Sequence, residues 1–226
     1  MPFMQNPQPL THASSSVSRP WDARLARRLV APLIHSWVTP NHLTTLRLGV
    51  GLAAAAAFMP GSYAWSNLAA LLLVLSNFLD HTDGELARMS GKTSRIGHLY
   101  DLASDAAVTI LLFIAIGVGL AGKPGVDLIL PPAALGLAAG SAIALIFFLR
   151  MRIEELHGKI ATRQASMGGF ETEDVLYLLP LATLSNALAP MLLIASICAP
   201  VFAIWVVIDY QRALRRDRRM TAGVAG

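Results

Sequence analysis

The strongest constraint on the fold of this chain is a series of apolar stretches, each close to the length of a membrane-spanning helix. A helix needs about 20 predominantly apolar residues to cross the hydrocarbon core of a bilayer. Scanning at that length predicts six spans, at residues 43–59, 63–79, 99–121, 128–149, 175–188 and 191–208. Hydrophobic residues make up 54% of the chain and charged residues only 14%, a composition that excludes a largely disordered chain and a coiled coil. The sequence therefore predicts an all-α integral membrane protein with six transmembrane helices.

The basic residues are distributed unevenly around these spans. Sixteen of the 18 lysines and arginines precede the first span, lie between spans two and three or four and five, or follow the sixth span. In a six-span topology these four segments share one side of the membrane, and the positive-inside rule makes that side cytoplasmic. Only Lys123 falls on the other side, and Arg47 lies near the start of the first span. We therefore expect both termini in the cytoplasm and a location in a prokaryotic inner membrane.

The segment before the first span has a helical pattern of its own. Apolar residues recur there at every fourth position: Trp21, Leu25, Leu29, Leu33 and Trp37. With arginines between them, this pattern is typical of an amphipathic helix in the membrane interface, although a cap helix facing the cytoplasm is the alternative. Pro32 predicts a bend in this helix. The chain then divides into a flexible N-terminus (1–18), an interfacial helix (19–38), a transmembrane catalytic domain (39–210) and a basic cytoplasmic tail (211–226).

Acidic residues cluster at the predicted ends of spans two and three, where an ionised side chain is costly and commonly functional. They are Asp80, Asp83, Glu85, Asp101 and Asp105. On a helix, Asp80 and Asp83 share a face with Gly84, Ala87 and Arg88. In the same way, Asp101 and Asp105 share a face with Gly97. Any one of these aspartates alone would more often be a helix cap or a loop residue at a membrane surface, but the whole set predicts four carboxylates facing one another across two antiparallel helices.

Four facing carboxylates repel one another unless some are protonated or a cation joins them. A site made only of oxygen ligands favours a hard cation, most simply Mg²⁺ or Mn²⁺. Two such ions can bridge a diphosphate, and Arg88 can donate hydrogen bonds to phosphate oxygens. The small residues on the two helices would leave room for a ligand. The pattern therefore predicts a metal-dependent site for a phosphorylated substrate.

The spacing of these residues resembles the signature of the CDP-alcohol phosphotransferase family. The pattern is Asp80-x2-Asp83-Gly84-x2-Ala87-Arg88-x8-Gly97-x3-Asp101-x3-Asp105, with every fixed position filled. Upstream, Thr39-Pro40-Asn41-His42-Leu43-Thr44 followed by Arg47 is similar to the stretch that opens the first membrane helix in that family. The resemblance covers almost the whole chain, and it implies six transmembrane helices, an N-terminal interfacial helix and a site that faces the cytoplasm.

The resemblance also implies a reaction and a set of roles. A CDP-linked alcohol would donate its substituted phosphoryl group to the hydroxyl of an acceptor alcohol, and CMP would leave. The metal ligands for two Mg²⁺ or Mn²⁺ ions would be Asp80, Asp83, Asp101 and Asp105, and Asp105 would also be the general base. The pocket for the CDP donor would be lined by Asn41, Thr44, Gly84, Ala87, Arg88, Ser94 and Gly97.

The sequence leaves the two substrates open. We expect CDP-diacylglycerol as the donor and a small polar alcohol as the acceptor. An interfacial helix suits a lipid donor, and basic residues on the cytoplasmic side suit a phosphorylated acceptor. The converse pairing joins a soluble CDP-amino alcohol to diacylglycerol. A polyprenyl transferase would carry a second aspartate-rich motif, and a transporter would place its carboxylates near the midplane and show internal repeats. The sequence has no second aspartate-rich motif, its acidic residues cluster at one predicted membrane surface, and it shows no internal repeat.

Two further partners are expected. The lipid bilayer is one, since the arginine-rich segment 212–219 suits anionic headgroups better than nucleic acid, which is not expected to bind. The other is a second copy of the chain, because the family resemblance implies a homodimer. Gly136 and Gly140 form a GxxxG step that favours close helix packing, most commonly within one chain.

Overall fold

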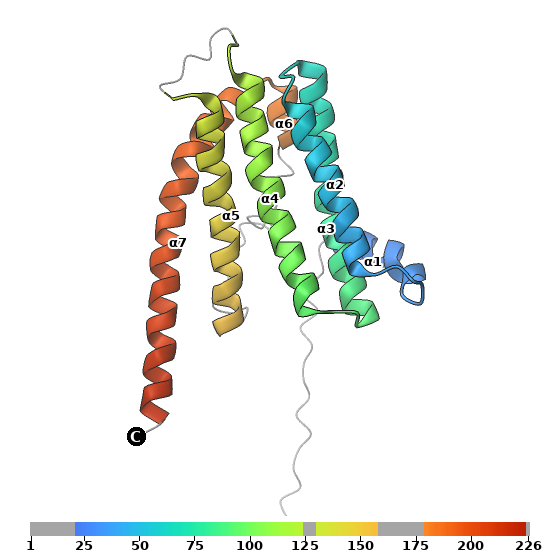
Figure 1. Ribbon diagram of the computed structural model, residues 1–226, viewed down its shortest axis with the longest axis vertical. Helices are drawn as coiled ribbons and strands as arrows, with labels where there is room; N and C mark the ends of the chain where they lie inside the picture. Colours follow the sequence, from blue (N-terminus) through green and yellow to red (C-terminus); the bar gives the residue numbers. More distant parts are fainter. Residues whose placement is uncertain (1–20, 124–129, 158–178, 225–226) are drawn as a thin grey trace, which may run out of the picture.

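The computed structural model describes residues 21–123, 130–157 and 179–224, and within these ranges the chain forms helices only (Figure 1). The elements in chain order are α1 (Trp21–Val30), the 3-10 helix η1 (Ala31–Leu33), α2 (Pro40–Phe58), α3 (Tyr63–Ser90), α4 (Arg95–Leu120), α5 (Pro132–His157), α6 (Leu179–Leu184) and α7 (Leu188–Val224). The all-α prediction is confirmed for this part of the chain. The segment 1–18 and the start of the fifth predicted span lie outside the described residues.

Three of the described helices are long and apolar enough to cross a membrane. They are Arg95–Leu120, Pro132–Ile153 and Leu188–Arg215, and they coincide with the third, fourth and sixth predicted spans. Helix α2 covers the first predicted span except its last residue, α3 contains the second, and α6 contributes six residues to the fifth. Asn186, with φ of 53°, forms the turn into α7, which then continues as helix into the predicted basic tail.

Helix caps set the short connection between α3 and α4. The last helical residue of α3 is Ser90, and Gly91 follows with φ of 68°, in the left-handed conformation that glycine adopts at little cost. Ser94 then caps α4 by accepting a 2.9 Å hydrogen bond from the backbone N–H of Gly97. The two helices are therefore antiparallel neighbours joined by four residues. This connection directs the last turns of α3 toward the first turns of α4.

The N-terminal helix packs beside this connection. Helix α1 ends before Pro32, which lies in η1, so the predicted bend is a change of helix type. Its buried residues Ala26 and Val30 face the protein, where α1 contacts α3, while Leu25 and Leu29 are exposed. Lys92 Nζ donates a 2.8 Å hydrogen bond to the carbonyl oxygen of Ser36, which ties the segment after η1 to the α3–α4 connection.

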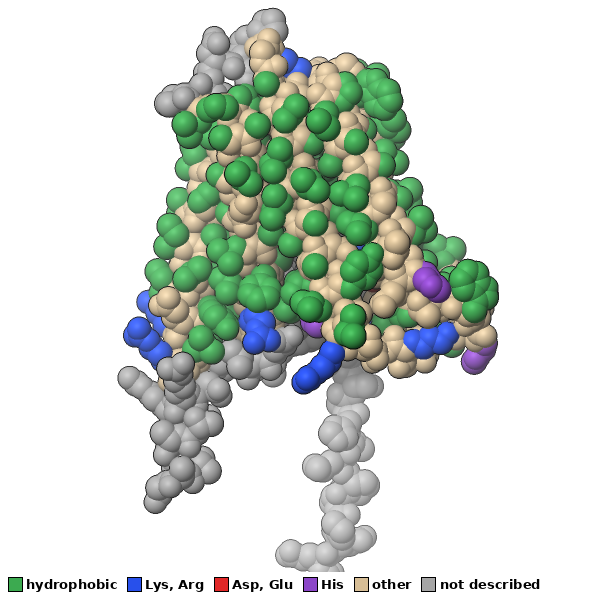
Figure 2. Space-filling view, in the orientation of Figure 1, with side chains coloured by type: hydrophobic (Ala, Val, Ile, Leu, Met, Phe, Trp, Pro, Cys, Tyr) green, Lys and Arg blue, Asp and Glu red, His purple; other side chains and the backbone are tan. Residues whose placement is uncertain are grey.

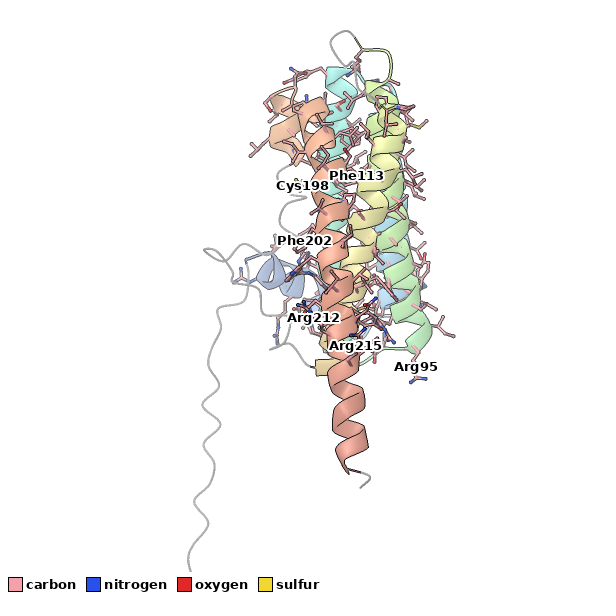
Figure 3. The ribbon with its side chains drawn as sticks, turned by 90° about the vertical axis from the view of Figure 1, so that its left-hand side faces the viewer. Arg95, Phe113, Cys198, Phe202, Arg212 and Arg215 are labelled. Atoms are coloured by element: carbon pink, nitrogen blue, oxygen red, sulfur yellow. The ribbon has the colours of Figure 1, made fainter. Side chains whose placement is uncertain are left out.

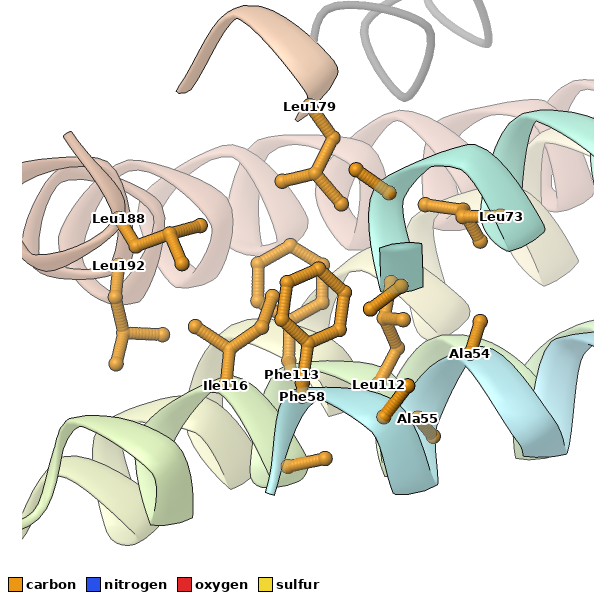
Figure 4. Close-up of a cluster of buried hydrophobic side chains, with 14 of the residues drawn as sticks. Ala54, Ala55, Phe58, Leu73, Leu112, Phe113, Ile116, Leu179, Leu188 and Leu192 are labelled. Carbon is orange, nitrogen blue, oxygen red and sulfur yellow. The ribbon is translucent and has the colours of Figure 1, made fainter. Parts of the chain in front are cut away.

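The remaining helices pack through small residues and a cluster of large apolar ones. A Cβ atom at Gly136 would clash with the carbonyl of Phe113, and one at Gly140 would lie 2.9 Å from Ile110 Cα. The GxxxG step is therefore used between α5 and α4 of one chain. The apolar core, part of which is drawn in Figure 4, joins α2, α3, α4, α5, α6 and α7. Its largest fully buried members include Phe58, Leu73, Leu112, Ile116 and Leu192.

The surface is divided into an apolar band and a basic end. Figure 2 shows apolar side chains over most of one face and lysine and arginine side chains gathered at its lower end. That end carries the α3–α4 connection and the C-terminal part of α7 (Figure 1). In Figure 3, Arg212 and Arg215 of α7 lie at the same end of the bundle as Arg95, the first residue of α4.

Candidate active site

Three aspartates from α3 and α4 converge just inside the basic end of the bundle. Asp80 of α3 and Asp101 and Asp105 of α4 each offer a carboxylate oxygen, and these oxygens lie within 4.8 Å of one another. Their side chains are 35–48% exposed, so they border solvent-accessible space. Carboxylate oxygens are the hard ligands that Mg²⁺ and Mn²⁺ prefer in proteins. We call these three residues the acidic triad.

Asp83 lies outside the acidic triad. Its residue is only 4% exposed, and its Oδ2 accepts a 2.8 Å hydrogen bond from Thr44 Oγ1 of α2. Asp80 and Asp83 are three residues apart and therefore point about 60° apart around α3, since successive residues of an α-helix are separated by about 100°. That difference lets Asp80 face α4 while Asp83 faces α2. The structure thus places the predicted ligand Asp83 beside the other three without bringing it into their group.

A buried arginine contacts every member of the acidic triad. The side chain of Arg47, on α2, is 5% exposed. Its Nη1 donates to Asp80 and to Asp105, and its Nη2 donates to Asp101 Oδ1 at 2.9 Å and to the Asp101 carbonyl at 3.2 Å. No role in the site was expected for Arg47 from the sequence. The available signal was an arginine within an otherwise apolar helix, which is costly in a membrane and usually paired.

The residues expected to bind the CDP donor lie at the same end of the bundle, on three helix ends. Asn41 and Thr44 are on the first turns of α2; Gly84, Ala87 and Arg88 are on the last turns of α3; Ser94 caps α4 and Gly97 is on its first turn. A Cβ atom at Gly97 would lie 2.7 Å from Asn41 Oδ1, so α2 and α4 approach closely there. The Arg88 side chain is 66% exposed and forms a 2.9 Å ion pair with the buried Glu85.

A cavity of about 530 Å³ opens beside the acidic triad. Its polar side is formed by the triad with Arg47, His81 and His98. Its apolar side includes Leu73 of α3, Leu112 of α4, and Phe147, Phe148 and Met151 of α5. None of the seven CDP-binding candidates is among the described residues that line it. The cavity therefore leads from the acidic triad toward the apolar interior, while the CDP candidates lie on the side of the triad nearer the helix ends.

The similarity to known proteins covers the helices that carry the acidic triad. The family model for CDP-alcohol phosphatidyltransferase matches residues 37–211, which include both aspartate-bearing helices. The chain is 34% identical over 101 residues to an archaetidylinositol phosphate synthase of Pyrococcus horikoshii, covering 44% of this chain and 52% of that protein. It is 28% identical over 128 residues to a phosphatidylinositol phosphate synthase of Streptomyces avermitilis, covering 56% of this chain and 51% of that protein.

A third relative is cholinephosphotransferase 1 of Danio rerio, 35% identical over 95 residues, which covers 37% of this chain and 24% of that protein. The chain thus spans about half or less of the length of these curated relatives. The family match confirms the resemblance found in the aspartate signature, and with the three apolar helices it identifies an integral membrane protein. The chain belongs to the CDP-alcohol phosphatidyltransferase family.

Proposed function

We propose that this protein transfers the phosphatidyl group of CDP-diacylglycerol to the hydroxyl of a small polar alcohol and releases CMP, as a step of phospholipid biosynthesis. The observation that carries the proposal is the cavity, which has the acidic triad at one side and the apolar residues Leu112, Phe147 and Phe148 at the other. A CDP-linked lipid has the same division, with a charged diphosphate attached to apolar chains. A site with this polarity can hold both parts of such a donor at once.

The reaction requires one bond to form and one to break. The acceptor oxygen attacks the lipid-side phosphorus of the diphosphate, and the bond from that phosphorus to the oxygen of CMP breaks. The hydroxyl proton passes to the carboxylate of Asp105, which lies beside the cavity and is the most exposed member of the acidic triad. Asp105 is therefore proposed as the catalytic base.

The proposed metal ligands are the acidic triad and Asp83, holding two Mg²⁺ or Mn²⁺ ions. Their fit rests on the oxygen donors of the triad, which are hard ligands within 4.8 Å of one another. Bound divalent ions would offset the negative charge of the diphosphate and stabilise the charge that develops on the leaving phosphate. The protein itself contributes the placement of the carboxylates and the orientation of the donor.

The proposed pocket for the CDP group lies at the helix ends. Arg88 is exposed there and can donate paired hydrogen bonds to phosphate oxygens. Gly84 leaves the backbone of α3 accessible, since the nearest atom to an added Cβ there is 3.7 Å away on Arg88, and Gly97 would line the pocket where it lets Asn41 of α2 approach α4. Asn41 and Thr44 would contact the nucleotide from the first turns of α2. Ala87 and Ser94 complete this set of residues.

The proposed acceptor is a phosphorylated small alcohol. Arg212 and Arg215 of α7 lie at the end of the bundle that carries the site (Figure 3) and would attract an anionic acceptor. Two of the relatives are named phosphatidylinositol phosphate synthase and archaetidylinositol phosphate synthase, and these names support the same class of acceptor. The match to a cholinephosphotransferase supports a second candidate, in which a CDP-amino alcohol reacts with diacylglycerol.

The proposal includes a topology. Six spans over the transmembrane catalytic domain, residues 39–210, would place both termini and the basic tail in the cytoplasm, and the membrane would be a prokaryotic inner membrane. The lysines and arginines at the end that carries the site support this orientation. The exposed Leu25, Leu29 and Trp37, the last 83% exposed, would place the predicted interfacial helix in the headgroup region. A homodimer is proposed from the family alone.

The test uses the full chain in liposomes with Mn²⁺ and a panel of substrates. One arm offers radiolabelled CDP-diacylglycerol with glycerol phosphate, inositol, inositol phosphate or serine, and the other offers CDP-choline with diacylglycerol. We expect CMP release and a new phospholipid in the first arm, with one acceptor. Product only in the second arm would replace the donor with a CDP-amino alcohol, and no CMP in either arm would contradict the transferase function.

A further inference from the structure

We propose that Arg47 is a positioning residue, which gathers the acidic triad from its buried side so that the three carboxylates are ready to receive a divalent ion. This inference rests on the proposed metal role of the triad. It concerns a residue of a different helix, α2, which belongs neither to the aspartate signature nor to the residues expected to bind CDP.

Arg47 contacts only one of the two oxygens of each carboxylate in the acidic triad. Every hydrogen bond from the guanidinium to a side chain of the triad ends on an Oδ1 atom, on Asp80, Asp101 and Asp105 alike, and one more goes to the backbone carbonyl of Asp101. The arginine therefore uses one oxygen of each carboxylate and leaves each Oδ2 outside its hydrogen bonds. Because Arg47 is 5% exposed and the three carboxylates are 35–48% exposed, the guanidinium lies on the buried side of the triad.

The charges explain why such a residue is needed. Three carboxylates within 4.8 Å repel one another, and on separate helices this repulsion would drive them apart. When all three carboxylates are ionised, the single positive charge of Arg47 leaves a surplus of two negative charges in the group, so the triad still attracts divalent cations. Arg47 thus holds the three carboxylates together without neutralising them completely.

The backbone around Arg47 is fixed by close packing. The hydroxyl of Ser76 on α3 donates a 3.1 Å hydrogen bond to the carbonyl of Arg47. One turn later, Gly51 lets α2 approach α4, because a Cβ atom there would lie 2.7 Å from the methyl groups of Val108. The guanidinium therefore reaches the triad from a constrained point on α2. A planar fork of donors can bond two carboxylates from one nitrogen and a third from the other, whereas the single ammonium of a lysine cannot reproduce this pattern.

Two explanations of Arg47 make opposite predictions about metal affinity. If Arg47 only neutralises charge, its removal leaves a more acidic site, and a divalent ion should bind more tightly. If Arg47 positions the carboxylates, its removal lets them separate, and the ion should bind more weakly. Loss of a group that orients metal-ligating carboxylates typically costs about 10- to 100-fold in metal affinity. The direction of the change therefore decides between the two explanations.

The experiment measures Mn²⁺ binding to the full chain in lipid nanodiscs without substrate, from the electron paramagnetic resonance signal of free Mn²⁺. The variants are Arg47→Gln, Arg47→Lys and the control Arg95→Gln, which removes an exposed arginine from the same end of the bundle. We expect wild-type affinity in the control, a dissociation constant raised about 10- to 100-fold in Arg47→Gln, and a smaller increase in Arg47→Lys. Thermal melting and circular dichroism check that each variant is folded.

Each outcome bears on one proposal. Unchanged or tighter binding in both Arg47 variants would overturn the positioning role while leaving the proposed metal site intact. If Arg47→Gln does not fold, Arg47→Lys decides the question, because it retains the buried positive charge and changes only the donor geometry. An absence of Mn²⁺ binding by the wild-type protein would overturn the metal role of the triad itself, and the positioning role with it.

Discussion

Thr44 Oγ1 of α2 donates a 2.8 Å hydrogen bond to Asp83 Oδ2 of α3, in a part of the site where both residues are buried. This contact joins a residue from the segment Thr39–Arg47 to one from the aspartate signature, 39 positions later in the chain. The two sequence motifs therefore meet as one structural unit, with α2 supporting the carboxylates of α3 and α4.

The first prediction concerns this contact. Thr44→Val keeps the shape of the side chain and removes the hydroxyl, which leaves the buried Asp83 carboxylate without this donor. We expect a loss of about 1–3 kcal/mol in the free energy of unfolding, measured by denaturant titration in detergent, together with reduced CMP release. Thr44→Ser, which keeps a hydroxyl, should retain most of both. Equal stability of the valine and serine variants would contradict a role for the hydrogen bond.

The second prediction tests the proposed base. Asp105→Asn keeps the size of the side chain but cannot accept the acceptor's proton, so CMP release should fall by about 100-fold or more. The protein should remain folded and inserted in the membrane, as checked by size-exclusion chromatography and thermal melting. Asp209→Asn, which changes an aspartate on α7 outside the acidic triad, is the control and should keep its activity. Normal turnover by Asp105→Asn would exclude this residue as the base.

The third prediction uses two glycines with different surroundings. Gly97→Ala would bring a Cβ atom to 2.7 Å from Asn41 Oδ1 and 3.0 Å from Ser94 Oγ, two residues expected to bind CDP. We expect the KM for the CDP donor to rise several-fold. Gly49→Ala, on α2, has no atom within 4 Å of the added Cβ and should leave KM unchanged. An equal KM in the two variants would show that the approach of α2 and α4 does not shape the donor pocket.

The fourth prediction concerns metal removal. Chelation with EDTA should abolish CMP release, because the acidic triad would lose the ions proposed to bind the diphosphate. Re-addition of Mg²⁺ or Mn²⁺ should restore activity and raise the melting temperature, since a ligand that binds only the folded state stabilises it. The shift in melting temperature should be smaller in Asp101→Asn. Full activity after exhaustive chelation would exclude a metal-dependent reaction.

The sequence predicted the parts of the site that depend on helical periodicity. The spacing of Asp101 and Asp105 places them on one face of α4, and the short connection between Gly91 and Ser94 brings that face to α3. The same periodicity grouped Asp83 with Asp80, but an offset of about 60° around a helix is enough to direct two side chains toward different neighbours. Which neighbour each one reaches depends on the packing of α2, which the spacing does not encode.

Other parts of the site arise only from tertiary packing. The contacts of Arg47 span 33 to 58 positions in the chain, and an isolated arginine in an apolar helix does not indicate which carboxylates it will reach. Phe147 and Phe148 of α5 belong to a long apolar stretch with no local feature that marks them as cavity lining. The position of α5 on α4 is set by Gly136 and Gly140, whose pairing partners could not be identified from the sequence.

The most direct test of the central claim is the affinity of the full chain for CDP, measured by isothermal titration calorimetry with and without Mn²⁺. If carboxylates of α3 and α4 hold divalent ions that bind the diphosphate, CDP should bind the wild-type protein only when Mn²⁺ is present. In Asp101→Asn, CDP should bind weakly under both conditions. CDP affinity that is independent of Mn²⁺, or unchanged in Asp101→Asn, would contradict the account.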